Sequence, residues 1–317
     1  MAVLDRPPRV AGPGMPEPTP SDAGNEVSRG LPWLRWRRRR RSARVPWVSI
    51  SIVLFILVLP AIFADLITTH DPLRGQLADR LTPPAWAQDG TWSYPLGTDK
   101  QGRDILTRII YGARISLMVS SVTILIGAFV GATLGLVAGY FGGWADRIVS
   151  WLVDTFLSLP HVLLALVIVA AIGPSFVTII VVIAATIWSA FARQIRGETL
   201  SVREAEYVAR ARVAGASPAR ILKRHVLPNV ANTLIVLATL QVGVVILEEA
   251  SLSFIGAGIP RPNPSWGVMV ADGRDQILTA WWVSLFPGVA ILLVVLSLNL
   301  LGDWLRDFLD PKLRQRG

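Results

Sequence analysis

The sequence predicts an all-α protein: a polytopic membrane bundle of six transmembrane helices. Hydrophobic residues make up 52% of the chain and its mean hydropathy is +0.50, which exceeds the usual values for a soluble globular protein. Six apolar segments are each suited to crossing a hydrocarbon core of about 30 Å. The basic residues gather in alternate connections between these segments, as they do in multi-pass membrane proteins.

The chain begins with a stretch rich in Pro, Gly and small polar residues, which predicts disorder over residues 1–30. Five consecutive arginines, Arg37 to Arg41, then precede the first apolar run. With a net charge of +9, such a run would suggest nucleic acid in a soluble protein. Beside a membrane span the expected counterions are lipid headgroups, so we predict contact with the bilayer and no nucleic-acid partner.

The predicted spans follow in order, and two of them are weaker than the others. Asp154, Pro160 and His161 interrupt the third span, and the fourth span is the shortest. The six predicted spans are residues 47–67, 115–141, 148–172, 176–192, 230–256 and 281–302.

The distribution of charge predicts the orientation of the chain in the membrane. Ten basic and four acidic residues lie in 1–46, and eight basic and three acidic residues lie in 193–228. Region 65–112 carries five basic and six acidic residues, and region 257–280 carries two of each. The positive-inside rule therefore places both termini and region 193–228 in the cytoplasm, which requires an even number of spans.

A charged, helix-forming stretch, residues 200–229, separates two apolar segments, and we call it the insert. Ser201 and Glu204 have the spacing of a capping box, which predicts the start of one short helix. Ser217 followed by Pro218 predicts the start of a second helix. Neither helix is long enough to be stable in isolation, so both need support from the membrane domain or from a partner.

We place the break between these two helices at Gly215. Small residues crowd the first helix and the break, where they would let a helix backbone enter a groove of a partner: Ala205, Ala209, Ala211, Ala214 and Ala216. Basic side chains of the insert could then bind an acidic rim of that groove. On composition alone, an ordinary cytoplasmic connector remains the alternative.

Region 94–108, YPLGTDKQGRDILTR, is predicted to be a structured loop on the outer side. Its turn-forming and hydrogen-bonding residues predict either packing of the loop on itself or docking of a partner. The residues concerned are Pro95, Gly97, Asp99, Gly102, Arg103 and Asp104.

Ionisable and polar side chains inside membrane spans need partners or water, so they are candidates for a translocation path. Adjacent Glu248 and Glu249 lie about 100° apart on a helix, so one could line the path while the other bonds within the bundle. The alternative is solvation at helix ends or structural hydrogen bonding. The candidates are Asp154, His161, Gln241, Glu248 and Glu249.

A stripe of glycines at four-residue spacing, Gly127, Gly131, Gly135 and Gly139, predicts close helix packing in the second span. The stripe could pack inside the bundle or against a second membrane subunit. The chain contains no cysteine, three scattered histidines and no phosphate-binding, zinc-protease or serine-nucleophile motif. We therefore predict no catalytic residue, metal site or cofactor in this chain.

Several motifs resemble those of permeases from the dipeptide/oligopeptide ABC importer family. Residues 94–117 are similar to the signature H-P-L-G-T-D…G-R-D…L-S-R…G-A-R-x-S-L, with Tyr94 in place of His and Thr107 in place of Ser. P-S-W-G at 264–267 and the stretch NLLGDWLRDFLDPKLR at 299–314 resemble the same family. The resemblance covers roughly residues 45–315.

The insert resembles the EAA coupling loop of these permeases. Gly215, Leu227 and Pro228 have the spacing of that motif, and Ala211 fills its last Ala position. The sequence departs from the motif at three positions, Ala209, Arg210 and His225. The pattern E-Y-V…R-H-V-L-P-N is similar to the local sequence of the dipeptide/oligopeptide branch.

The resemblance implies a type I ABC-importer permease fold in a bacterial plasma membrane. It implies a second homologous permease, two ABC ATPases that carry ATP and Mg, an extracytoplasmic solute-binding protein and a peptide substrate. Expected ATPase-coupling residues are Glu206, Tyr207, Ala209, Ala211, Gly215, Ala216, Leu227 and Pro228. Expected binding-protein docking residues are Gly97, Asp99, Gly102, Arg103 and Asp104.

The expected organisation has four parts, of which the third is the importer domain and contains coupling helices 201–228. The parts are a cytoplasmic Arg-rich tail 1–46, a first transmembrane helix with an external loop 47–112, the transmembrane domain 113–306 and a cytoplasmic tail 307–317. The competing hypothesis is a self-sufficient secondary transporter or channel that uses intramembrane carboxylates.

Overall fold

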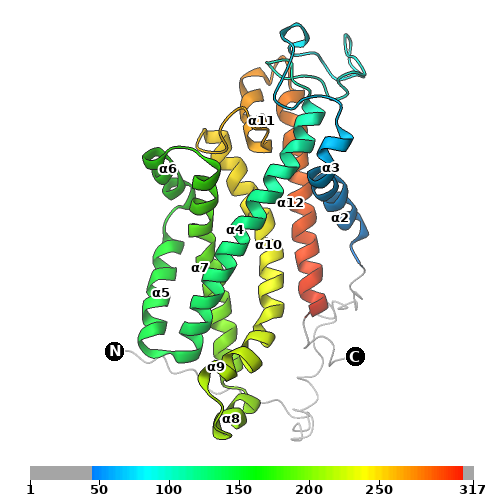
Figure 1. Cartoon of the computed structure of the whole chain (residues 1–317). Coiled ribbons are helices and arrows are strands. Elements are labelled where there is room, and N and C mark those ends of the chain that lie inside the picture. Colours follow the sequence, from blue (N-terminus) through cyan, green and yellow to red (C-terminus); the bar gives the residue numbers. More distant parts are fainter. Residues whose placement is uncertain (1–44, 310–317) are drawn as a thin grey trace, which may run out of the picture. The chain divides into compact units, whose positions relative to one another are not determined.

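The structure, a computed structural model, describes residues 45–309 (Figure 1). The predicted N-terminal tail, except its last two residues, and positions 310–317 of the C-terminal tail lie outside the described residues. Within the described range the chain is helical and has no β-strand, only an isolated bridge between Thr98 and Asp104. The prediction of an all-α bundle is confirmed.

Helices of three kinds follow one another along the described chain. In order they are α2 (Trp47–Ile52), the π-helix η2 (Val53–Val58), α3 (Leu59–Ile67), the 3-10 helix η3 (Leu77–Asp79), α4 (Ile105–Phe141), α5 (Gly143–Ser158), α6 (His161–Ile172), α7 (Phe176–Arg203), α8 (Glu206–Val213), α9 (Pro218–Ile221), the π-helix η4 (Leu222–Val226), α10 (Leu227–Ile255), α11 (Trp266–Gly273), the 3-10 helix η5 (Arg274–Gln276) and α12 (Trp282–Leu309).

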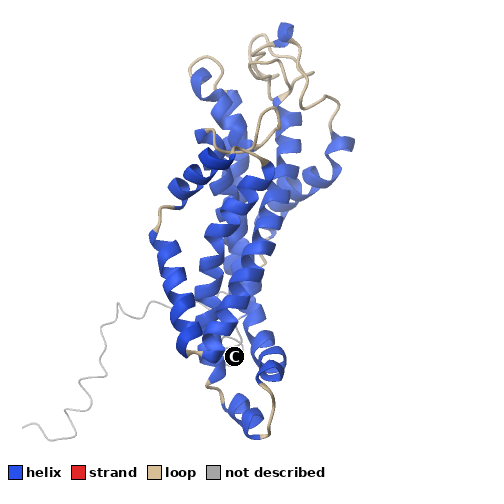
Figure 2. Ribbon diagram, turned by 60° about the vertical axis from the view of Figure 1, so that its left-hand side comes forward, coloured by secondary structure: helices blue, strands red, loops and turns tan. Residues whose placement is uncertain are grey.

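Five continuous helices of the described chain are long and apolar enough to cross a membrane, and a sixth span exists if α5 and α6 are counted together. These two helices meet at an angle of 88°, so the predicted third span is broken and not straight. Leu159 has extended backbone angles because it precedes Pro160, whose ring disfavours a helical conformation in the preceding residue. Figure 2 shows the resulting bend.

Two long helices extend beyond the predicted spans. Helix α4 begins at Ile105, ten residues before the predicted start, and α7 continues to Arg203. The predicted capping box of Ser201 and Glu204 is therefore wrong. Ser201 lies inside α7, and α8 begins after Ala205 without a side-chain cap.

The glycine stripe of α4 packs against α7 inside the bundle, which was the first of the two alternatives. A Cβ atom on Gly127 would lie 2.6 Å from Cγ1 of Ile187, and a Cβ on Gly135 would lie 2.7 Å from the carbonyl oxygen of Ala192. No side chain fits at these distances. Only glycine allows the two helix backbones to approach so closely.

The remaining helices pack around this central pair. The first span, Trp47–Ile67, lies against α4 and α12, while α10 contacts α4, α7 and α12. Helix α11 packs on α10 and α12, and its Trp266 is fully buried in the largest apolar cluster. The Trp266 indole Nε1 donates a hydrogen bond of 2.9 Å to the Ile109 carbonyl, which attaches α11 to α4.

Candidate functional site

Two candidate sites lie at opposite ends of the helices. Helices α8 and α9 of the insert lie at one end, where α7 ends and α10 begins, and the loop of residues 68–104 lies at the other end (Figures 1 and 2). A third candidate site, made by polar residues inside the spans, lies between them.

Helix α8 of the insert ends in a Schellman motif centred on Gly215. The Gly215 amide donates to the Arg212 carbonyl and the Ala216 amide donates to the Ala211 carbonyl, each at 3.1 Å. Gly215 has a φ of +77°, in the left-handed region that favours glycine. The predicted break at Gly215 is confirmed.

Helix α9 begins as the sequence predicts. The hydroxyl of Ser217 accepts a hydrogen bond of 3.4 Å from the Arg220 amide, and Pro218 occupies the first helical position. The chain then passes through η4 directly into α10, which has Leu227 and Pro228 in its first turn. The second half of the insert is therefore continuous with a membrane span.

The inner face of the insert is packed onto the bundle. Its buried side chains, Val208, Ile221 and Val226, share one apolar cluster with Ala132 of α4, Ile195 of α7 and Val230 of α10. Half-buried Ala211 and Ala216 contact the same cluster. The insert is therefore in direct apolar contact with α4 and α7.

The outer face of the insert is exposed. The exposed residues of the predicted coupling set are Glu206, Tyr207, Ala209, Gly215, Leu227 and Pro228. Val213 is 91% exposed, and sequence analysis did not single it out. A signal was present, since Val213 is a β-branched apolar residue at the end of a helix whose other exposed residues are mostly polar.

Two basic side chains of α7 hold the turn between α4 and α5 near the insert. Arg196 forms a bidentate pair with Asp146, with Nη2 at 2.8 Å from Oδ2. Arg203 donates to the carbonyls of Gly139 and Tyr140 at 3.3 and 3.1 Å, where α4 ends. These partners lie about fifty or more residues apart in sequence, so sequence patterns gave no indication of them.

The loop of residues 68–104 is organised around the buried carboxylate of Asp99. This carboxylate accepts hydrogen bonds from the amides of Gln101 and Arg103 at 2.8 and 3.0 Å and from Arg103 Nε at 2.7 Å. Arg108 Nε lies 3.7 Å from the same carboxylate. Of the two alternatives for this loop, packing on itself is confirmed.

Asp104 starts α4. Its carboxylate accepts hydrogen bonds from the amides of Leu106 and Thr107 at 3.3 and 3.0 Å and from the Thr107 hydroxyl at 2.6 Å. Gly97 and Gly102 have φ values of +81° and +72° and form the turns between these polar groups. All five predicted docking residues are buried, so a partner at this end would contact other side chains that this cluster positions.

Asp272 of α11 connects this loop to the end of the bundle. Its carboxylate lies 2.9 Å from Arg261, 3.5 Å from Lys100 and 3.9 Å from Arg103. Sequence analysis did not identify Asp272, because it lies more than 160 residues from the loop that it binds. We call residues 68–104 and 256–281 together the loop cap.

Tyr94, which stands where the family signature has His, is also bonded within the loop cap. Its hydroxyl donates a hydrogen bond of 2.8 Å to the carboxylate of Asp79, and this bond raises the pKa of the Tyr94 phenol. Its ring lies 5.1 Å from the imidazole of His70. Tyr94 therefore makes a polar contact inside the loop cap.

The structure separates the predicted path residues into three environments. Asp154 forms an exposed ion pair of 2.7 Å with Arg193. Glu249 is buried and accepts a hydrogen bond of 2.7 Å from the Ser253 hydroxyl. Gln241 is half-buried on α10.

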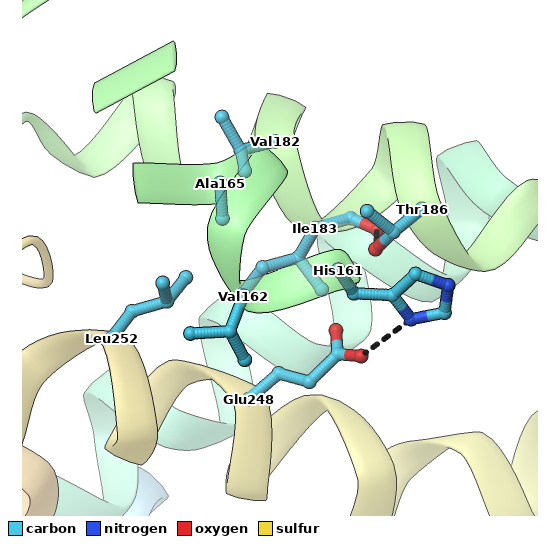
Figure 3. A pocket seen from close by; sticks show the side chains of 8 residues that line it. All are labelled: His161, Val162, Ala165, Val182, Ile183, Thr186, Glu248 and Leu252. Atoms are coloured by element: carbon cyan, nitrogen blue, oxygen red, sulfur yellow. Dashed lines mark hydrogen bonds and ion pairs between the residues drawn. The ribbon is translucent and has the colours of Figure 1, made fainter. Parts of the chain in front are cut away.

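His161 and Glu248 form the third environment. His161 Nδ1 lies 3.6 Å from Glu248 Oε1, and both side chains are half-buried. They line a pocket between α6, α7 and α10, and Figure 3 shows the carboxylate pointing toward the imidazole. The other residues that line the pocket are Val162, Ala165, Val182, Ile183, Thr186 and Leu252.

Comparison with known proteins identifies the class to which this architecture belongs. Residues 131–315 match the family described as "Binding-protein-dependent transport system inner membrane component". An inward-facing structure of the MetNI methionine ABC transporter aligns with a TM-score of 0.52 and 20% identity, covering 64% of this chain and 96% of that chain. At this identity the likeness shows the fold, and it confirms the predicted importer-permease fold.

More similar sequences are known from bacteria. The dipeptide transport system permease protein DppC of Alkalihalophilus pseudofirmus is 40% identical over 300 residues, which cover 94% of this chain and 96% of that protein. The di/tripeptide permease DppC of Pseudomonas aeruginosa is 41% identical over 263 residues, covering 83% and 87%. The glutathione permease GsiD of Pectobacterium atrosepticum is 39% identical over 289 residues, covering 87% and 94%.

The chain belongs to the family of inner-membrane components of binding-protein-dependent transport systems. Within that family it is a permease of the dipeptide/oligopeptide ABC importer type, a multi-pass membrane protein. These relatives do not favour the hypothesis of a self-sufficient secondary transporter or channel.

Proposed function

We propose that this chain forms one half of the translocation path of an ATP-driven importer for dipeptides or oligopeptides. A second, homologous permease would form the other half. Two ABC ATPases would supply ATP and Mg, and an extracytoplasmic solute-binding protein would deliver the peptide. The names of the bacterial relatives, which include dipeptide and di/tripeptide permeases, support this class of substrate.

The observation that carries the proposal is the construction of the insert. Its inner face is packed on α4 and α7, both of its ends continue into membrane spans, and its outer face is exposed. A partner that moved α8 would therefore move the spans with it. The insert would occupy a groove of an ATPase subunit, and closure of the ATPases would shift the spans between inward-facing and outward-facing states.

The same proposal places the insert and both termini in the cytoplasm. Eight basic residues against three acidic ones in residues 193–228 favour the cytoplasmic side. The loop cap, at the opposite end, would then face the binding protein. Because Asp99 and Arg103 are buried there, exposed residues of the loop cap such as Trp92 and Leu278 would make the contact.

The test replaces exposed Val213 with glutamate in the assembled importer. We expect Val213→Glu to reduce both the co-purification of the ATPases and peptide uptake by about tenfold or more, since a buried unpaired carboxylate costs several kcal/mol at a contact. The matched control is Leu278→Glu, at a residue that is 96% exposed at the other end. Its ATPases should co-purify as in the wild type.

Full retention of the ATPases and of uptake by Val213→Glu would contradict the proposed contact. Loss of the ATPases in both variants would indicate a general folding defect. A purified wild-type complex that binds its ATPases and transports no peptide would overturn the substrate class and leave the coupling role intact.

A further inference from the structure

We propose that the pocket of His161 and Glu248 faces the water-filled path and that Glu248 binds a cationic group of the transported solute, which for a peptide is the terminal ammonium. This inference rests on the proposed function, because it assumes that a solute passes along this chain. It selects one pocket from among the five candidate path residues and states which chemical group that pocket binds.

The exposed fractions of His161 and Glu248 indicate which way the pocket faces. The side chains of His161 and Glu248 are 35% and 20% exposed, although both residues lie within apolar spans. An ionisable side chain exposed to lipid costs several kcal/mol, so such side chains face water or a protein partner. The pocket therefore opens toward water or a partner subunit and not toward lipid.

The opposite case occurs on α4. The exposed side chains of α4 from Met118 to Phe141 include no ionisable group and are mostly apolar, with Ser121 and Thr133 as the polar exceptions. The apolar ones include Met118, Val122, Leu125, Ile126, Phe129 and Val130. This surface suits lipid or an apolar helix. An exposed ionisable pair thus distinguishes the surface at the pocket from this surface of α4, and an aqueous path would require such a pair.

The other two carboxylates among the path candidates, Glu249 and Asp154, do not line this pocket and have partners of their own. The carboxylate of Glu249 is buried against Ser253, and the Ser253 hydroxyl also accepts a hydrogen bond of 3.2 Å from the Ile259 amide. Glu249 therefore attaches the loop after α10 to its own helix. Asp154 is neutralised by Arg193 at 2.7 Å.

The pocket combines three polar side chains with an aliphatic lining. Glu248 contributes a carboxylate, Thr186 a hydroxyl and His161 an imidazole, and the remaining lining is aliphatic (Figure 3). Among residues 45–309, Glu248 has one ionisable partner, at 3.6 Å, so its second oxygen can accept a hydrogen bond from an ammonium group. The aliphatic lining lowers the local dielectric and strengthens that attraction.

The position of Glu248 fits an entry site. It lies seven residues before Ile255, the end of α10, which corresponds to about 10 Å along the helix. The pocket is therefore nearer to the loop cap than to the insert. A solute that enters from the loop cap would meet Glu248 before it reached the middle of the bundle.

The test uses cysteine chemistry, since the chain has no native cysteine. Val162→Cys introduces one thiol into the pocket at a residue that is 37% exposed, and it leaves His161 and Glu248 in place. The assembled importer is treated with a cationic trimethylammonium methanethiosulfonate or an anionic sulfonate analogue. Modification of this chain is followed by its intact mass.

We expect Val162→Cys to react with both reagents, with the cationic reagent favoured by roughly tenfold over its preference for a free thiol. The added substitution Glu248→Gln should remove that preference. Phe129→Cys on the apolar face of α4 is the control and should react with neither reagent. If Val162→Cys reacted with neither reagent, or if its preference for the cationic reagent were unchanged by Glu248→Gln, the inference would be wrong.

The ligand is tested by protection in the importer without its binding protein. A dipeptide with a free amino terminus should slow the cationic reaction of Val162→Cys, and the N-acetylated dipeptide should not. Equal protection by both peptides, or protection by neither, would contradict the assignment of an ammonium site.

The outcomes also separate this inference from the proposed function. If the wild-type importer takes up peptides while Val162→Cys remains silent, the pocket assignment fails alone. If Val162→Cys shows the cationic preference while the wild-type importer takes up no peptide, the substrate class fails and the water-facing pocket remains.

Discussion

The two ends of the bundle differ in the burial of their charged residues. In the loop cap, Asp99, Arg103 and Asp272 are buried and bonded to one another. In the insert, Glu206 and Arg210 are 89% and 80% exposed although they lie only 3.0 Å apart. The charged groups of the loop cap are paired with one another, whereas the charged residues of the insert and its exposed Val213 remain available to a partner.

This difference shows why a motif rich in charge does not by itself identify a contact surface. Charged residues in the loop cap hold a non-helical chain together, because buried loop backbone and buried charge both require partners. Charged residues in the insert have no such task, since α8 already satisfies its own backbone. Burial decides which role a charge has, and substitutions at the two ends can test that assignment.

The largest effect is expected from Asp99→Ala in the loop cap. This substitution leaves the buried guanidinium of Arg103 without its closest partner, and breaking a buried pair in this way costs about 3–5 kcal/mol. Thermal unfolding of the purified importer in detergent should show a large decrease in Tm, and protease cleavage of residues 68–104 should become faster. An unchanged Tm would mean that the loop is held by other contacts.

A smaller effect is expected from Gly215→Ala in the insert. The site has room for a methyl group, but the φ of +77° costs a residue with a side chain about 1–2 kcal/mol. We expect normal assembly and a decrease in Tm of only a few °C, with reduced peptide uptake and reduced coupling of ATP hydrolysis to uptake. Gly143→Ala is the control, because it has a similar φ of +57° and equal space outside the insert.

If both glycine variants lost coupling equally, the effect would come from backbone strain in general. If Gly215→Ala, or a bulkier substitution at the same residue, retained full stimulated ATPase activity and uptake, the mechanical role of the insert would be wrong.

The smallest effect is expected from Arg210→Ala. Its exposed ion pair with Glu206 is of the kind that contributes at most about 0.5 kcal/mol, so Tm should change by no more than about 2 °C. This variant is the counterpart of Asp99→Ala at the other end. A decrease in Tm as large as that of Asp99→Ala would remove the distinction between the two ends.

Much of the bundle could be predicted because apolar length and glycine spacing are local signals. The spans, the break at Gly215 and the helix start at Ser217 all follow from residues close together in sequence. The failed prediction at Ser201 has the same origin. Its capping spacing is real, but α7 is held helical to Arg203 by contacts with α4 that no local pattern reveals.

The candidate sites were predicted less completely, since their partners lie far apart in the chain. The pairs Arg196–Asp146 and His161–Glu248 join residues 50 and 87 positions apart, and neither could be read from spacing. The 88° bend between α5 and α6 was signalled by Pro160, but its size depends on how α6 packs against α7 and α10.

The central claim is that the insert transmits motion from a nucleotide-hydrolysing partner to the spans, and cross-linking from Val213→Cys tests it most directly. A short thiol-to-amine cross-linker in the assembled importer should join this chain to an ATPase subunit, with a yield that changes between nucleotide-free and ATP-bound states. Labelling of Val213→Cys from the outer side of sealed cells, or the absence of any ATPase adduct in both states, would contradict the account.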